Sequence, residues 1–341
     1  MLCYYIGLWL PSGTVAKLTG SMLLGRVMLV LWAAGGLWLV IRLVFEAIGQ
    51  VKLRILWIFV FFSGIDIIPF YIYGHSIDRY LNAGWTVPDF GAYSPLAWWT
   101  DQLSTIYWIY NQIIPAWLGC MLVLGTAPTR AIPAVISFML ISSPIPSVAL
   151  FPAGAYRWVR SAWYNTSSLK TCVRQLASWH LWIALILAIP IGLYFCANTS
   201  ASTHTSVYTI NSMARLAKTM IHIGLLLLFE IGVFIPFVWR YVKRDATFYI
   251  LLATAVCALF VRTGIQGMDF ASRASIPLIL FMSVAVGRFA TDWNHQRRAV
   301  RIAFICIALL ALPGPMFEVA RPTYTPPAAP FPDRAANAPA P

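Results

Sequence analysis

Ionisable side chains inside strongly apolar stretches are the residues of this sequence best placed to do chemistry. Asp66 interrupts FFSGIDIIPF beside Gly64, and Glu230 interrupts LLLLFEIGVF, with His222 two turns earlier on roughly the same helical face. Charge inside a bilayer is costly, so these residues are candidates for a polar cavity, a headgroup site or a proton relay. A structural interpretation is also open for each. Asp66 can be a carboxyl group near the membrane interface, and Glu230 and His222 can form a structural contact between helices, which we favour.

A second candidate pair lies in GMDFASRASIP, where Asp269 and Arg273 are four residues apart on one helical face. The pair is either a simple ion pair at a helix mouth or an arginine fork offered to a phosphate.

Polar residues also recur among the aromatic residues of WWTDQLSTIYWIYNQIIPAW, namely Asp101, Gln102, Asn111 and Gln112. This pattern is typical of a plain interfacial helix, and the alternative is a helix that lines a sugar or lipid groove.

Motifs for several common chemistries are absent from the sequence. It contains no Walker A, GxGxxG, GxSxG or HExxH pattern. The six cysteines are dispersed, without CxxC or Cys/His spacing, so neither a zinc site nor a disulfide framework is predicted. We therefore expect no metal and no cofactor, and we assign no catalytic residue.

The elements that must position these residues are membrane helices. The chain is 60% hydrophobic and only 10% charged, whereas soluble domains carry about 25% charged residues. Its net charge of +13 comes from Lys and Arg placed singly or in small groups beside apolar runs. That is the pattern of positive-inside topology rather than of nucleic-acid binding. We expect a multi-pass protein of a bacterial inner (plasma) membrane, with membrane lipids as partners and no nucleic acid.

Nine stretches are candidates for membrane-embedded segments, because a helix needs about 20 apolar residues to cross the bilayer core. The clear ones are 21–46, 54–73, 178–196, 219–239, 246–262, 274–289 and 299–313. The stretches 102–127 and 131–157 are broken by proline or polar residues. The predicted fold is an all-α polytopic transmembrane bundle with about 8–9 such segments.

Basic residues predict the topology, since cytoplasmic loops hold the excess of Lys and Arg. Four groups stand out: Arg42, Lys52 and Arg54; Arg157, Arg160, Lys170 and Arg174; Arg240, Lys243 and Arg244; Arg288, Arg297, Arg298 and Arg301. All four fall on one side only if 131–157 enters and leaves by the same face, reversing at the two prolines of SSPIPS. We predict a re-entrant pair of short helices there, with Arg130 and Arg157 both cytoplasmic.

The remaining segments follow from this topology. The stretches 74–101 and 197–214 hold few basic residues and are expected outside. The Pro/Ala-rich tail from Pro313 lacks periodicity and is expected to be disordered. The predicted domains are therefore a transmembrane domain, 1–312, and a tail, 313–341.

Five stretches follow one another along most of the chain up to about residue 290. They are YYIGLWLPSGTVAKLTG (4–20), FFSGIDIIPF (61–70), QLSTIYWIYNQIIPAWL (102–118), SSPIPSVALFP (142–152) and MDFASRASIPLILF (268–281). In content and order they resemble a group of large bacterial polytopic membrane proteins of the GT-C glycosyltransferase-like type.

The resemblance implies transfer of a sugar from a polyprenyl-phosphate donor on the outer face. It also implies a catalytic carboxylate in a first outer loop, upstream of the stretch that here begins within a few residues of Met1. We therefore expect this chain to correspond to the C-terminal portion of such a protein. Asp66 and Asp269 do not match the upstream position, so neither inherits the catalytic role.

Three functions remain open at this point. The leading one is a glycosyltransferase-like protein in which Arg273 holds the donor phosphate, and we expect it to lack its own catalytic loop. The alternatives are a transporter or flippase for a lipid or small solute, using Asp66 and Glu230, and a non-catalytic membrane subunit. A transporter predicts polar residues near mid-membrane on several helices. Glu230 is nearly alone there in the sequence, which favours the transferase.

Overall fold

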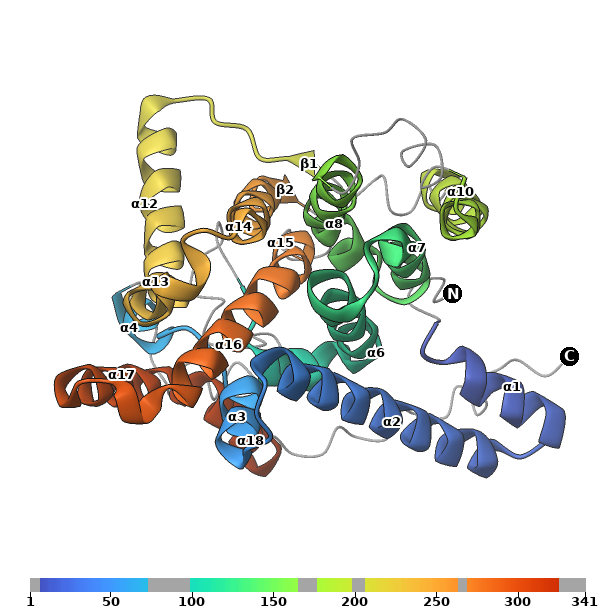
Figure 1. Ribbon diagram of the computed structural model, residues 1–341, viewed down its shortest axis with the longest axis horizontal. Helices are drawn as coiled ribbons and strands as arrows, with labels where there is room; N and C mark the ends of the chain where they lie inside the picture. Colours follow the sequence, from blue (N-terminus) through green and yellow to red (C-terminus); the bar gives the residue numbers. More distant parts are fainter. Residues whose placement is uncertain (1–6, 73–98, 165–176, 198–205, 263–268, 325–341) are drawn as a thin grey trace, which may run out of the picture.

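The computed structural model describes residues 7–72, 99–164, 177–197, 206–262 and 269–324, and these form a helical bundle (Figure 1). In this part of the chain the β structure is one antiparallel pair, β1 (Ser206–Val207) with β2 (Val261–Arg262). The α-helices are α1 (Leu10–Thr19), α2 (Met22–Ile48), α3 (Leu53–Val60), α4 (Ile67–Ile72), α6 (Gln102–Met121), α7 (Ile132–Ser142), α8 (Pro144–Tyr164), α10 (Trp179–Ala197), α12 (Met213–Glu230), α13 (Ile235–Val242), α14 (Ala246–Ala258), α15 (Asp269–Ala274), α16 (Ile276–Thr291), α17 (Arg298–Ala311) and α18 (Pro313–Tyr324). Short helical turns are Leu122–Thr126, Thr129–Ala131, Gly232–Phe234 and Trp293–His295.

Local sequence explains where several helices begin. Ser21, Ser212 and Asp245 cap α2, α12 and α14, each accepting a hydrogen bond from a backbone N–H of the first turn. Proline stands in the first turn of α7, α13 and α16, where its missing N–H costs nothing. At the other end of α2, Gly49 adopts the left-handed conformation with φ of 80°.

Three helical segments of the described chain are long and apolar enough to cross a bilayer: Met22–Ile48, Gln102–Gly125 and Arg298–Ala320. A fourth candidate is α12 with Gly232–Val242, which bends by 41° at the break between them. The protein is therefore an all-α membrane protein. The other apolar helices are shorter, so the predicted total of 8–9 membrane-embedded segments remains a prediction.

Helices α7 and α8 form a hairpin, as predicted for 131–157. The chain reverses at Ser143, and the Thr129 and Ser161 hydroxyls hydrogen-bond at 2.7 Å where the hairpin begins and ends. At the turn, the Ser143 hydroxyl donates to the backbone carbonyl of Gln112, halfway along α6. Helix α7 has 11 residues and rises about 16 Å. Helix α8 has 21 residues, so the second arm of the hairpin is longer than the short helix that was predicted.

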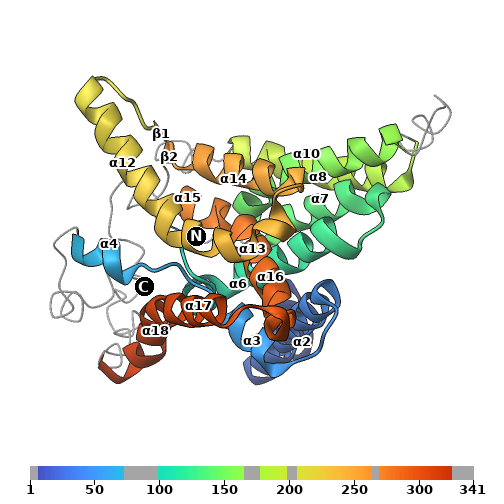
Figure 2. The same cartoon turned by 60° about the vertical axis from the view of Figure 1, so that its left-hand side comes forward.

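The bundle packs around α16, which contacts α2, α3, α6, α8, α13, α14 and α15. Helices α7, α8, α10 and α14 lie nearly along the view of Figure 1 and are seen lengthwise in Figure 2. Glycines allow close crossings: a Cβ on Gly36 of α2 would lie 2.7 Å from Ile114 of α6. A Cβ on Gly287 of α16 would lie 2.4 Å from Ile48 of α2. Small residues at crossings are typical of membrane bundles, where close packing drives association.

Two predicted spans are broken in the structure. The stretch 54–73 consists of α3 and the short helix α4, with non-helical backbone between them, and 219–239 is divided into α12 and α13. Neither break contains a proline at its centre, and both lie in apolar runs, so the sequence did not predict that the helices are interrupted there.

The sequence predicted disorder from Pro313, but the structure begins helix α18 there, and residues 325–341 of the predicted tail lie outside the described residues. Helix α18 packs on α6, and the indole Nε1 of Trp108 donates to Glu318 Oε2 at 3.2 Å. The predicted boundary at 312 therefore falls between two packed helices. A proline at the first helical position is compatible with a helix start.

Candidate functional site

Three carboxyl groups from distant parts of the sequence meet inside the bundle. Asp66, Asp101 and Glu230, here called the acidic cluster, expose only 4%, 3% and 2% of their surfaces. The Asp66 and Glu230 side chains hydrogen-bond to each other, and Asp66 and Asp101 repel each other electrostatically. The structure thus brings two predicted binding residues together with a predicted membrane-buried acid.

Asp66 ends the non-helical segment that follows α3. The Ser63 hydroxyl donates to Asp66 Oδ2 at 3.3 Å, and the Ile65 N–H donates to the Phe229 carbonyl at 2.9 Å. Asp66 Oδ1 is buried and accepts no hydrogen bond from the described residues. A buried carboxylate oxygen without a donor is costly, so this atom marks a place for a ligand, water or proton.

Asp101 is fixed by the start of α6, which it caps. Its Oδ1 accepts from the Ser104 backbone N–H at 2.8 Å, and its Oδ2 accepts from the Ser104 hydroxyl at 2.7 Å. The next residue, Gln102, ties this end of α6 to two other elements. Its N–H donates to the Phe62 carbonyl at 3.3 Å, and its amide donates to Ser283 of α16 at 3.4 Å.

Glu230 is the last residue of α12, where the helix bends. Gly64 lies directly against it: a Cβ on Gly64 would be 2.7 Å from Glu230 Cα and 2.5 Å from Glu230 Oε2. Glycine is therefore required at position 64 for the two broken segments to meet.

The turn between α17 and α18 covers the acidic cluster. A Cβ on Gly314 would lie 3.3 Å from the Ser63 hydroxyl oxygen and 3.8 Å from the Oδ2 atoms of both Asp66 and Asp101. The two carboxylates therefore face the same point of the C-terminal helices.

An apolar groove of about 470 Å³ adjoins the acidic cluster between α3, α16, α17 and α18. Six aromatic side chains line it: Trp57, Phe61, Phe62, Phe234, Trp293 and Phe304. Ser63 also lines it, and within the described chain no charged side chain does. The hydroxyl that contacts Asp66 thus forms part of the groove wall.

Comparison with protein-family models, with curated proteins and with solved structures finds no match to this chain.

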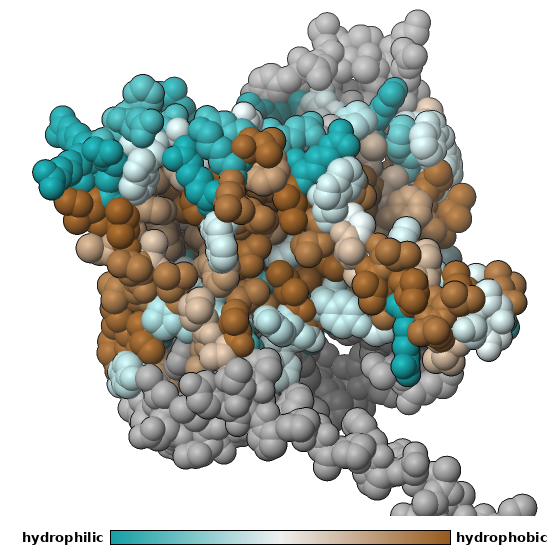
Figure 3. Space-filling model, turned by 90° about the horizontal axis from the view of Figure 1, so that it is seen from below, coloured by the Kyte–Doolittle hydropathy of each residue, from teal (hydrophilic) through white to brown (hydrophobic). Residues whose placement is uncertain are grey.

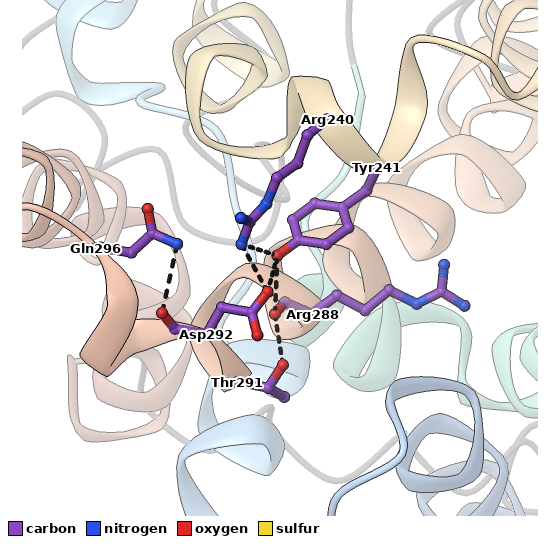
Figure 4. Close-up of polar contacts among 6 residues, drawn as sticks. All are labelled: Arg240, Tyr241, Arg288, Thr291, Asp292 and Gln296. Carbon is purple, nitrogen blue, oxygen red and sulfur yellow. Dashed lines mark hydrogen bonds and ion pairs between the residues drawn. The ribbon is translucent and has the colours of Figure 1, made fainter.

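Basic residues gather where α2, α13 and α16 end, away from the acidic cluster (Figure 4). Arg240 of α13 pairs with Asp292 at 2.6 Å, and the Tyr241 hydroxyl donates to the same carboxylate at 2.5 Å. Arg288 of α16 donates two hydrogen bonds, of 3.2 and 3.0 Å, to the Ala47 carbonyl near the end of α2. We call the place where α2, α13 and α16 end the basic end.

Members of three of the predicted cytoplasmic groups lie at the basic end, while their cytoplasmic placement remains a prediction. Arg157 of the fourth group interacts electrostatically with Asp245, three residues beyond α13. Figure 3 shows hydrophilic residues gathered along one edge of the molecule, above a hydrophobic band. Lys170 and Arg174 lie outside the described residues.

The acidic cluster is separated from the basic end by the length of one short helix. Helix α3 follows Lys52 and leads to Ser63, while α13 follows the Glu230 break and leads to Lys243. Each has eight residues and rises about 12 Å. This is close to half the thickness of a bilayer core. Glu230 therefore has Asp66 and Asp101 as neighbours inside the bundle, whereas the sequence indicated that it is nearly alone.

The other predicted site residues lie elsewhere. Gln112 is buried halfway along α6, against the turn of the α7–α8 hairpin, and Asn111 beside it is half-buried. Arg273 belongs to α15, which packs on α8 and α14. The Asp269 side chain lies outside the described part of the structure, so its pairing with Arg273 remains a prediction.

His222 is the remaining titratable candidate from the sequence. His222 is buried on α12, two turns before Glu230. No group of three His, Cys, Asp or Glu residues in the described chain has the arrangement of a metal site.

Sequence reasoning missed Ser63, Gly314 and the aromatic groove. A weak signal existed for Ser63, since Ser63, Gly64 and Asp66 are crowded into an otherwise apolar run. Gly314 and the groove depend on how α17 and α18 fold back, which no local pattern specifies.

Proposed function

We propose that the protein is a carrier in a bacterial plasma membrane that moves an amphipathic solute or a lipid across the bilayer. The observation that carries this proposal is the acidic cluster, in which Asp66 and Glu230 stand at two breaks and Asp101 at a helix start. Substrate sites of secondary transporters lie near the midplane at broken helices, because non-helical backbone is tolerated there only when buried or lining a cavity.

The link between the two breaks supports this proposal. The Ile65 N–H donates to Phe229, so the non-helical segment after α3 satisfies part of its hydrogen bonding at the end of α12. A rearrangement of either break then changes the other, which is the coupling that alternating access requires.

The transport proposal is tested with purified full-length protein in proteoliposomes. Transbilayer movement of a panel of fluorescent amphiphiles is measured: NBD-labelled phosphatidylglycerol, NBD-labelled phosphatidylethanolamine and ethidium. We expect at least one to move faster than in empty liposomes, and the increase to be lost in Asp66→Asn. Glu318→Gln is the matched control, because Glu318 is equally buried but bonds Trp108 instead. If none of the three moves faster than in empty liposomes, the proposal fails.

A second candidate function is the glycosyltransferase-like one. The apolar groove beside Ser63 suits the chain of a polyprenyl-phosphate sugar, and Asp101 is the last residue of the predicted outer segment 74–101. In that case a carboxylate of the cluster would act as base on an acceptor hydroxyl, and Arg273 would hold the donor phosphate.

This second function is tested by incubating membranes with a radiolabelled polyprenyl-phosphate hexose. Transfer of label by the wild type that is abolished in both Asp101→Asn and Arg273→Ala would favour the transferase over the carrier. Absence of any transfer above vector membranes would remove it.

A further inference from the structure

The apolar groove and the acidic cluster share a wall, and their chemistries differ. The groove is lined by aromatic rings and aliphatic side chains, with Ser63 at the border. Behind Ser63 stands Asp66, whose Oδ2 accepts from the Ser63 hydroxyl at 3.3 Å and whose Oδ1 has no described donor. A ligand in the groove would therefore meet a buried carboxylate beyond one hydroxyl.

The charge of the acidic cluster sets what that ligand is. A hydrogen bond between the Asp66 and Glu230 carboxyl groups requires at least one proton on the pair, so the pair carries at most one negative charge and no positive charge. Asp101 adds a second carboxyl group facing the same Gly314. No charged side chain of the described chain lines the groove to balance them.

A phosphate or carboxylate ligand would be repelled by this arrangement, and a neutral lipid would leave Asp66 Oδ1 without a donor. A cation with apolar substituents suits both parts. Its charge is attracted by the cluster, while its substituents occupy the groove, and aromatic faces such as those of Trp57 and Trp293 also attract cations.

Access to the groove is from the side. Trp57, Ile305 and Leu309 line it and expose 54%, 45% and 60% of their surfaces. These residues lie on apolar helices, so the groove opens toward the lipid, where lipophilic cations concentrate.

We propose that the apolar groove and Asp66 together form a binding site for a lipophilic cation. This inference rests on the carrier function proposed above and names its substrate class. Binding is measured here without transport, so the two can fail separately.

The decisive comparison uses two probes of nearly the same shape and opposite charge, tetraphenylphosphonium and tetraphenylborate. Binding of each to purified full-length protein in neutral detergent is measured by isothermal titration, with tryptophan quenching as a second signal. We expect the cation to bind at least about tenfold more tightly than the anion. Equal or tighter binding of tetraphenylborate would overturn the proposal, and this result needs no variant.

Two variants locate the site. Asp66→Asn removes the charge while keeping the shape, and Ala308→Trp fills the groove from α17. Each should weaken tetraphenylphosphonium binding by about tenfold or more. The matched controls are Glu318→Gln, a buried acid outside the cluster, and Ala303→Trp, an exposed position on the same helix. The controls should stay within about twofold of the wild type.

The outcomes separate the proposals. If both site variants bind the cation as the wild type does, the site is wrong even when binding occurs. If the cation does not bind but a labelled lipid still crosses the bilayer in an Asp66-dependent way, the carrier function stands and the substrate class is wrong.

Discussion

Asp66 and Glu230 hydrogen-bond to each other at the point where two membrane segments lose their helical hydrogen bonding. Each residue alone is an ionisable group in an apolar run, with a structural explanation as good as a functional one. Together, and beside Asp101, they form a buried polar centre between the helices. The approach of these segments depends on the absence of a side chain at Gly64.

Gly64→Ala should therefore damage both stability and the polar centre. The added methyl group would lie 2.7 Å from Glu230 Cα, a backbone atom that cannot rotate away. We expect a loss of about 1–3 kcal/mol of stability, as for other overpacked sites. Thermal unfolding in detergent measures this, and tetraphenylphosphonium binding should weaken in the same variant.

The control for this prediction is Gly35→Ala in α2, where an added Cβ meets nothing within 4 Å. Alanine is favoured over glycine inside a helix by about 0.5–1 kcal/mol, so this variant should be neutral or slightly stabilised. Equal melting temperatures for Gly64→Ala and wild type would show that the two breaks do not meet as described.

The α7–α8 hairpin predicts a disulfide. The Thr129 and Ser161 hydroxyl oxygens are 2.7 Å apart, so cysteines at both positions bring their sulfur atoms within bonding reach. In a cysteine-free background, Thr129→Cys with Ser161→Cys should cross-link on mild oxidation, seen as a mobility shift reversed by reductant. Thr129→Cys with Ser143→Cys, at the far end of α7, should not. A cross-link in the second pair but not the first would reverse the assignment of the hairpin.

Much of this architecture was predictable from local patterns. Helix positions followed from apolar runs, so α2, α10 and α16 lie within a few residues of the predicted segments. The reversal of the chain in the α7–α8 hairpin followed from the two prolines near Ser143, while its re-entrant placement, with Arg130 and Arg157 on one side, remains a prediction.

The site was less predictable, because its members come together only through tertiary packing. Asp66 and Glu230 were singled out as costly ionisable residues in apolar runs and Asp101 as a polar residue of an interfacial helix, yet no periodicity relates the three to one another. Asp101 was interpreted as part of an interfacial helix because polar residues recur among the aromatic residues that follow it. Its place is instead set by the backbone bond from Gln102 to Phe62, which no sequence pattern specifies. The breaks in 54–73 and 219–239 were hidden by uniform hydropathy.

The basic end predicts which residues face the cytoplasm. Lys52 lies between α2 and α3 at this end, whereas Thr209 lies in the stretch expected outside. In a cysteine-free background, Lys52→Cys should react with a membrane-impermeant maleimide only after the cells are opened. Thr209→Cys should react in intact cells. Reaction of both from the same side would contradict the positive-inside topology.

The Arg240–Asp292 pair at the basic end should contribute little stability despite its short distance. The two atoms are 2.6 Å apart, but the side chains are 50% and 41% exposed. Water and salt screen such a pair, so a double-mutant cycle with Arg240→Ala and Asp292→Ala should give a coupling of about 0.2–1 kcal/mol. The coupling should fall as the salt concentration rises.

Tyr241 offers the internal comparison, because its hydroxyl donates to the same Asp292 oxygen and also lies 3.4 Å from the Arg288 carbonyl. Its coupling to Asp292, measured with Tyr241→Phe, involves a neutral donor and should therefore depend less on salt than the Arg240 coupling. A large, salt-independent Arg240 coupling would instead mean that the pair is shielded from water. The basic end would then be an interface covered by another part of the protein or by a partner.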